Sequence, residues 1–188
     1  HLMDNSNRET WNTKQMVADV DATNTGGKAI MGLKFGKHYL TGGLDFENIF
    51  KDGVRTMTMH MMGGTSTKKF NLWNKAVIQN TGLMASYSSV FGLYTFNAGL
   101  RMDVNKADSE DTLVLIKNGV EYFNETASEY VNFSANLGMT RKISEKLSLS
   151  LAIARGTRSP NMLERYIKLL TVGYDSYDYL GNPQLKPE

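Results

Sequence analysis

Leu93-Tyr94-Thr95-Phe96-Asn97-Ala98-Gly99-Leu100-Arg101-Met102-Asp103-Val104 is the stretch that decides the fold. From Tyr94 onward, apolar residues at even positions alternate with polar residues or glycine at odd positions. A helix would spread these apolar residues around its axis, whereas a strand gathers them on one face because successive side chains point to opposite sides. The stretch therefore predicts a β-strand with one apolar face and one face that carries Arg101 and Asp103.

The same two-residue period recurs on both sides of this stretch, and it predicts strands over His38–Phe50, Gly82–Ser89, Tyr130–Met139 and Leu147–Arg155. Over Lys14–Phe35 the apolar residues move from even to odd positions around Asn24-Thr25-Gly26-Gly27. Either a hairpin turn or one long strand with a glycine bulge would produce that change of parity, and we favour the bulge. We expect an all-β fold in which neighbouring strands pair as an antiparallel meander.

The connections between these strands alternate in length. Short connections at Gly36-Lys37, Ser88–Gly92 and Thr140–Lys146 alternate with long polar segments at Lys51–Asn80, Asn105–Glu129 and Gly156–Pro187. Short turns at one end and long loops at the other are typical of an outer-membrane β-barrel, whereas a soluble β-sandwich usually has short connections at both ends. In such a barrel the apolar faces contact lipid, and the lumen receives the charged residues Asp45, Glu47, Arg101, Asp103 and Arg155.

Composition excludes several other classes of protein. The chain has 188 residues, a net charge of +2 and no cysteine, so nothing in it argues for nucleic-acid binding, disulfides, a thiol nucleophile or a cysteine zinc site. No Gly-x-Ser-x-Gly or His-Glu-x-x-His motif is present, so the sequence does not predict an enzyme. A mean hydropathy of −0.35 is compatible with a barrel, because lipid-facing and lumen-facing residues average to mild polarity.

Methionine and histidine are concentrated in one short segment. Residues 57–62 hold four of the eleven methionines and one of the three histidines. Thioether sulfur suits Cu(I) and imidazole suits copper generally, and in a strand His60 and Met62 would share a face that we expect to line the lumen. Met57, Met59 and Met61 also alternate with polar residues, as in a half-buried or lipid-facing strand. A copper site and a purely structural role both remain open from these residues.

Three motifs near the C-terminus carry a resemblance to a known family. Gly156-Thr157-Arg158-Ser159-Pro160, Leu163-Glu164-Arg165-Tyr166 and Gly181-Asn182-Pro183-Gln184-Leu185-Lys186-Pro187-Glu188 resemble the barrel of a TonB-dependent outer-membrane receptor. The resemblance implies that residues 1–188 are part of a transmembrane barrel of 22 strands in the bacterial outer membrane. The plug domain, which contacts the TonB complex, and the remaining strands would be absent. It also implies transport of a metal ion or metal complex.

A narrower resemblance concerns the transported ligand. His1-Leu2-Met3-Asp4-Asn5, Thr25-Gly26-Gly27, Gly42-Gly43-Leu44-Asp45 and Met59–Met62 resemble TonB-dependent copper receptors. This resemblance implies copper as the transported ligand, without a resident cofactor, and His60, Met62 and Met59 as candidate metal ligands.

The alternatives are a siderophore or haem receptor and a passive outer-membrane channel. Arg158, Glu164 and Arg165 would then either contact an anionic ligand on a loop or bridge that loop to the plug.

Overall fold

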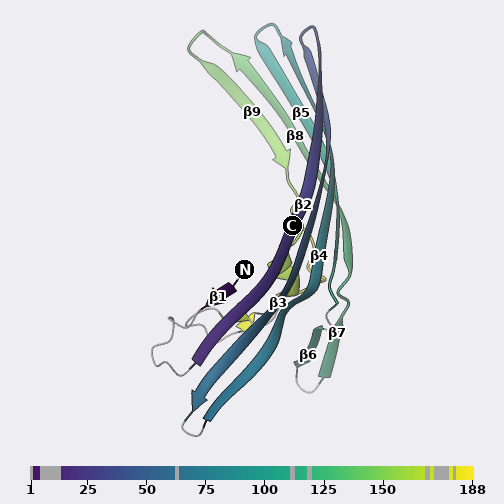
Figure 1. Cartoon of the computed structure of the whole chain (residues 1–188). Coiled ribbons are helices and arrows are strands. Elements are labelled where there is room, and N and C mark those ends of the chain that lie inside the picture. The colour runs from purple at the N-terminus through teal and green to yellow at the C-terminus, as the bar shows by residue number, and fades with distance from the viewer. Residues whose placement is uncertain are drawn as a thin grey trace.

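The computed structural model describes residues 2–4, 14–61, 64–110, 113–117, 120–167, 170–171, 178–179 and 181–188. Figure 1 shows a curved wall of long strands with one short helix, α1 (Met162–Tyr166), on its concave side. The strands of the main sheet follow the order β1 (Leu2–Asp4), β2 (Lys14–Phe35), β3 (His38–Met61), β4 (Gly64–Phe91), β5 (Tyr94–Asp108), β8 (Ser128–Lys142) and β9 (Ser148–Arg155). Two small hairpins complete it: β6 (Leu113–Lys117) with β7 (Val120–Asn124), and β10 (Leu170–Thr171) with β11 (Asp178–Tyr179).

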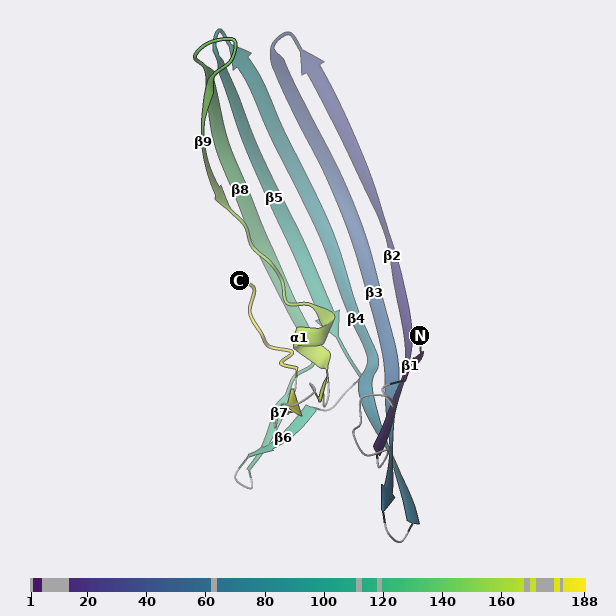
Figure 2. The same ribbon diagram turned by 90° about the vertical axis from the view of Figure 1, so that its left-hand side faces the viewer.

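The predicted antiparallel meander is confirmed, since β2, β3, β4, β5, β8 and β9 pair with their neighbours in that order. The predicted long segment Lys51–Asn80 differs from the structure. β3 and β4 continue through most of it as a paired extension beyond the rest of the wall, as Figure 2 shows. Of the other two long segments, one holds the β6–β7 hairpin and the other holds α1 and the paired strands β10 and β11.

Strand β2 contains neither the hairpin nor the glycine bulge that the sequence suggested, so both alternatives were wrong. Its pairing with β3 keeps one register from Lys14 opposite Met59 to Phe35 opposite His38. The parity of its apolar residues changes because the surroundings of each face change along the strand. Ala18 is buried on the concave face under α1, whereas Met31 is exposed on the convex face.

The irregularity lies instead in β4, opposite Gly53. Residues 72–75 of β4 face only residues 52–53 of β3, with Lys51 opposite Ala76 and Val54 opposite Asn71. Lys75 adopts a left-handed backbone conformation here, with φ of 45°. Extra residues on one strand increase its local bend and redirect side chains. Leu72 and Trp73, which are adjacent in sequence, are therefore both buried.

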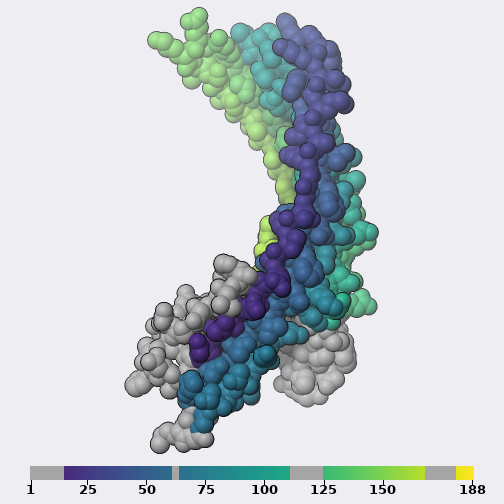
Figure 3. All heavy atoms as spheres, viewed as in Figure 1, coloured from purple at the N-terminus to yellow at the C-terminus, as the bar shows by residue number. Residues whose placement is uncertain are grey.

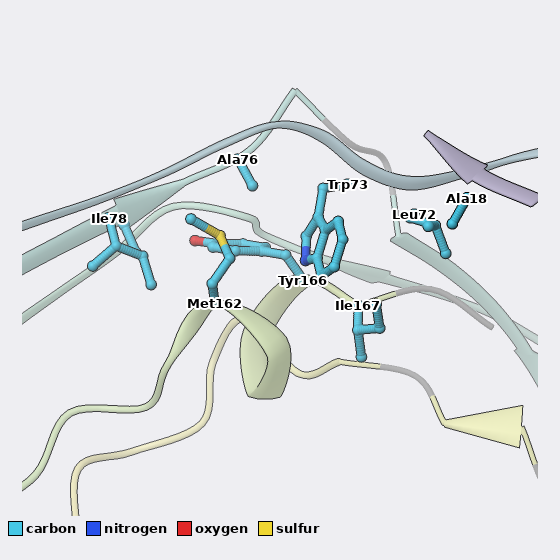
Figure 4. Close-up of a cluster of buried hydrophobic side chains, with 9 residues drawn as sticks. Ala18, Leu72, Trp73, Ala76, Ile78, Met162, Tyr166 and Ile167 are labelled. Atoms are coloured by element: carbon cyan, nitrogen blue, oxygen red, sulfur yellow. The ribbon is translucent and has the colours of Figure 1, made fainter. Parts of the chain in front are cut away.

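A hydrophobic core forms where α1 meets the concave face beside this bulge (Figure 4). The helix side contributes Met162, Tyr166 and Ile167, and the wall contributes Ala18, Leu72, Trp73, Ala76, Ile78 and Ala107. Burial of this apolar surface holds the helix on the wall.

The convex face carries large apolar side chains that are exposed. They include Leu33, Leu44, Leu83, Leu100, Phe133, Leu151 and Ile153, all more than half exposed. Apolar surface this extensive is typical of a face that meets a partner or a membrane, and here it matches the face that the sequence assigned to lipid. Within the described residues, no helix has both the length and the hydrophobicity to cross a membrane.

The concave face carries the charged residues that the sequence assigned to the lumen, with one correction. Asp45, Arg101 and Asp103 contact one another there. Arg155, which we expected beside them, pairs with Ala135 and shares the parity of Ile153, so the ladder places it on the convex side. The expectation rested on the charge of Arg155 alone, whereas the face of the residue is set by the register of β9 with β8.

Replacing Leu100 with arginine tests the assignment of the two faces. Leu100 is 67% exposed on the convex face, and a cation facing lipid costs about 2–4 kcal/mol at mid-membrane. We expect Leu100→Arg in the complete receptor to lower the free energy of unfolding by that amount, measured by urea titration in lipid vesicles. The control Asn97→Arg adds the same cation to an exposed position on the concave face of β5, and it should change the free energy of unfolding by only about 0.5 kcal/mol. Equal losses would contradict the assignment.

Candidate functional site

Polar side chains on the concave face form rows that run across the strands. Glu47, Asn80 and Asn105 lie opposite one another on β3, β4 and β5. Asn80 donates a hydrogen bond to Glu47 Oε2 over 3.2 Å, and Asn105 donates one to Asn80 Oδ1. Asn24 of β2 donates to the other oxygen of Glu47. The rows exist because facing residues of a ladder share a face, so four separate strands supply one connected polar surface.

The next row toward the short turns is an ion-pair cluster around Arg101. Its guanidinium donates two hydrogen bonds of 2.8 Å to the carboxylate of Asp45 and contacts both oxygens of Asp103. The guanidinium lies over Gly82, where an added Cβ would collide with it. This fork of donors spans two carboxylates and ties β3 to β5 across β4. The three side chains together carry a charge of −1, which is balanced by Lys28, opposite Asp45 on β2.

The covering loop, which we define as residues 156–167 and 181–188, brings together the three motifs that resembled a receptor. Arg158 of the first motif donates to both oxygens of Glu164 of the second, each over 2.9 Å, and to Glu188 of the third over 2.8 Å. Arg158 and Glu188 also exchange backbone hydrogen bonds. Residues 30 positions apart are therefore joined by one arginine.

Local capping and one glycine shape this loop. Asn161 accepts hydrogen bonds from the backbone of Leu163 and Glu164, while Glu164 accepts one from the backbone of Asn161, which is a capping box. At the other end of α1, an added Cβ on Gly181 would lie 2.5 Å from the Arg165 carbonyl group. Glycine is therefore the residue that lets the third motif close over the helix, where Pro183 is buried.

Arg165 is fully buried between this loop and the wall. Its guanidinium donates to Asn105 Oδ1 over 2.6 Å and to Ser128 Oγ over 3.1 Å, and it lies over the ring of Tyr130. Burial lowers the pKa of Arg165 below its ordinary value, and burial raises the pKa of the neighbouring Tyr166 to about 12. The contact with Asn105 connects the loop directly to the Glu47–Asn80–Asn105 row.

These contacts show what Arg158, Glu164 and Arg165 do in this conformation. Arg158 and Glu164 bind each other, and Arg165 is enclosed, so the three hold the covering loop in place. The structure does not bring them together with the methionine segment. An anionic ligand would reach the guanidinium of Arg165 only after the loop had left the wall.

One residue of the predicted copper pair, His60, is placed differently from expectation, and the other, Met62, lies outside the described residues. His60 is exposed, and its Nδ1 lies 3.0 Å from Thr65 Oγ1 on the neighbouring strand. Because β3 continues unbroken from Glu47, His60 falls on the convex side of the ladder, not on the lumen side that we expected. The expectation failed because it treated residues 51–80 as a loop, which would have reset the parity.

The same register places other methionines on the concave side. Met16 lies directly opposite Met57, and both share the face of Ala18, which is in the buried core. Met59 is two residues further along β3 on that face. All three side chains are half-buried. Met59 was a sequence candidate, but Met16 was missed, because only the pairing of β2 with β3 brings it to this position.

The donor atoms of this methionine group, defined as Met16, Met57 and Met59, are soft thioether sulfurs. Directly opposite residues on one face have Cβ atoms about 4.5–5.5 Å apart, and diagonal neighbours are about 7–8 Å apart, which flexible methionines can bridge. Among the described residues, no group of three or more His, Cys, Asp or Glu side chains could hold a metal ion.

Neutralising Arg158 tests the role of the covering loop. Arg158 and the Asn161 backbone N–H hold the pKa of Glu164 below its ordinary value of 4.5. Because the pKa of Glu164 is lower in the folded protein than in the unfolded chain, its ionised form stabilises the loop at any pH above the unfolded-state pKa. That stabilisation is lost as the pH falls through the folded-state pKa. We expect hydrogen-exchange protection of residues 158–167 to decline below about pH 4.5 in the wild type, and to be several-fold lower in Arg158→Gln at neutral pH.

The matched control is Lys106→Gln, which removes an exposed ion pair of 3.1 Å with Glu129 outside the loop. It should leave the protection of residues 158–167 unchanged, because exposed pairs contribute little. Unchanged protection in Arg158→Gln would show that the ion pairs do not hold the loop.

Comparison with known proteins agrees with this architecture. Residues 2–188 match the family model described as TonB dependent receptor-like, beta-barrel. No curated protein matches the chain. The solved structure of the copper transporter OprC has a similar fold, with a TM-score of 0.70 at 15% sequence identity, over 99% of this chain and 30% of the transporter. The chain, with its strand meander and polar concave wall, belongs to the TonB-dependent receptor family and forms part of a receptor β-barrel.

Proposed function

We propose that this chain is part of the barrel wall of an outer-membrane receptor that takes up copper. The complete receptor would supply a plug and its contact with the TonB complex, as the family implies. Support comes from the family match over residues 2–188 and from the fold shared with a copper transporter. The exposed apolar convex face supports a position in the outer membrane.

The single observation that carries the copper proposal is the methionine group on the concave face. Three methionines from the paired strands β2 and β3 share one face near the far end of these strands. Thioether sulfur selects Cu(I) over harder cations such as Mg²⁺ or Ca²⁺. An arrangement with three neutral soft donors would bind Cu(I) and release it readily to further ligands, which suits a site on a transport route.

The wall below that group would carry the ion inward. The Glu47 row and the Asp45–Arg101–Asp103 cluster present carboxylate and amide oxygens along the concave face. Their oxygen atoms are hard ligands and offer no soft donor to Cu(I). In this proposal the methionine group confers selectivity, and the polar rows provide hydrated, hydrogen-bonding surface toward the plug.

A siderophore or haem receptor is less well supported by the described residues. Arg158, which could bind an anionic chelate, already contacts Glu164 and Glu188, and Arg165 is buried. A pair formed by His60 and Met62 remains a second candidate for the copper ligands. His60 lies on the opposite face of β3 from Met59. One metal ion therefore cannot bind His60 and Met59 together unless the strand changes conformation.

Conservative substitution of the methionine group tests the proposal. Met57→Leu and Met59→Leu keep side-chain volume but remove the sulfur. In the complete purified receptor we expect each to weaken binding of Cu(I), or of Ag(I) as a redox-stable substitute, by about tenfold or more, equivalent to ~1.4 kcal/mol. Isothermal titration under reducing conditions would measure this. Met31→Leu, on the exposed convex face, should have no effect.

The outcome also separates the two sets of ligands. Loss of affinity in His60→Ala and Met62→Ala, with none in Met57→Leu or Met59→Leu, would assign the metal to the histidine–methionine pair. Full affinity in all four variants would remove the copper site from this part of the barrel, and the methionines would then have only a packing role.

A further inference from the structure

The end of the wall that carries the short turns has a continuous band of rings on its convex face. Phe35 stacks on His38 with ring centroids 5.3 Å apart, and His38 meets Phe91 edge-on at 5.6 Å. The contacts continue from Phe91 to Phe96 and from Phe96 to Tyr94, at 6.2 and 6.3 Å. Four strands, β2 to β5, contribute to this aromatic band.

The band ends in a cation. Arg141 of β8 lies over the ring of Tyr94, with its guanidinium carbon 5.5 Å from the ring centroid, and Arg141 is opposite Tyr94 in the ladder. Lys37 occupies the β2–β3 turn, and Lys142 and Lys146 flank the β8–β9 turn. We call these four exposed residues the basic rim. Glu145 is the single carboxylate within these turns, so the rim carries a net charge of +3.

Backbone hydrogen bonds fix the spacing of the rim. Val90 donates to the carbonyl oxygen of Lys37 over 3.1 Å, and Lys142 donates to that of Leu93 over 2.8 Å. The three turns are thereby tied side by side, as Figure 2 shows at the end of the wall. Among the described residues, none of the four cations forms an ion pair with a carboxylate. The rim is thus a preorganised row of charges without internal neutralisation.

Exposed apolar side chains continue directly from the rim along the convex face. On the convex face of the strands, Leu33, Phe35, Phe91, Leu149 and Leu151 are all more than half exposed. Leu93, Ile143 and Leu147 in the turns themselves are exposed to a similar extent. A ligand that fits this surface has apolar chains that run along the strands and an anionic head at the turns. The charge and the shape both match an anionic phospholipid, whose phosphate accepts hydrogen bonds from arginine and lysine.

We propose that the basic rim and the aromatic band form a binding site for anionic phospholipid in the membrane leaflet at the short-turn end. The cations of the rim lie along several strands, so the site takes a row of lipid head groups, each phosphate beside one or two cations such as Lys37 or Arg141, and the acyl chains cover the apolar residues below. The site requires the membrane position given by the family, but it does not depend on copper. Loss of copper binding in the methionine variants would leave it unaffected.

Lipid selectivity measured by electron paramagnetic resonance tests this site. The complete receptor is reconstituted in phosphatidylcholine vesicles with a trace of chain-labelled phosphatidylglycerol or phosphatidylcholine, and the immobilised fraction of each is compared. We expect the wild type to prefer phosphatidylglycerol roughly two- to fivefold. The preference should disappear in about 1 M salt, where the Debye length falls to about 3 Å.

The decisive variant is Lys37→Gln/Arg141→Gln, which should reduce the preference to near unity. Its matched control is Lys68→Gln/Lys69→Gln, which removes two exposed cations near the start of β4 and should retain the preference. Figure 3 shows the wall from the short turns at one end to the β3–β4 extension at the other. Heat-modifiable electrophoretic migration confirms that both variants are folded. Equal immobilisation of the two lipids by the wild type, or an unchanged preference in Lys37→Gln/Arg141→Gln, would overturn the proposal. If that variant does not fold, the salt dependence of the wild type decides.

Discussion

The unbroken pairing of β2 with β3 is the constraint on which the rest of this wall depends. Strand β2 keeps a single register with β3 over all of its 22 residues. Even-numbered residues of β2 therefore stay on one face and odd-numbered residues on the other. A shift by one residue would exchange the two faces completely. The environment can change along a strand, but the parity cannot. This is why Ala18 enters a buried core while Met31, on the other face of the same strand, meets the surroundings of the barrel.

The second determinant is the loop that covers the concave face. A closed set of contacts joins Arg158, Glu164 and Glu188, and α1 buries Tyr166 against the bulge in β4. Burying the Arg165 cation is costly, and its hydrogen bonds to Asn105 and Ser128 and its contact with Tyr130 offset part of that cost. The same arginine ends the polar row that begins at Glu47, so the position of the loop and the polarity of the wall are physically connected.

Apolar, polar and sulfur-containing side chains therefore occupy different faces of the wall and different positions along its strands. The convex face presents apolar side chains, bounded at the short turns by aromatic rings and cations. The concave face presents carboxylates and amides over much of its length and thioethers on its extension. A membrane-embedded transport protein requires this separation, because a charge costs little in a wet lumen and several kcal/mol toward lipid, about 2–4 at mid-membrane.

Alternation in the sequence determined the strands, their antiparallel order and the faces of Leu100 and Arg101, because a period of two depends only on local backbone geometry. The motifs around Arg158 and Glu188 indicated the family. Only the tertiary structure decided that residues 51–61 continue β3, which moved His60 to the convex face. It also decided that Met16 lies opposite Met57, and that Arg165 is buried. Each of these features depends on the register between segments that are far apart in the chain. The register is set by which surfaces become covered on folding, and the sequence of one strand does not contain that information.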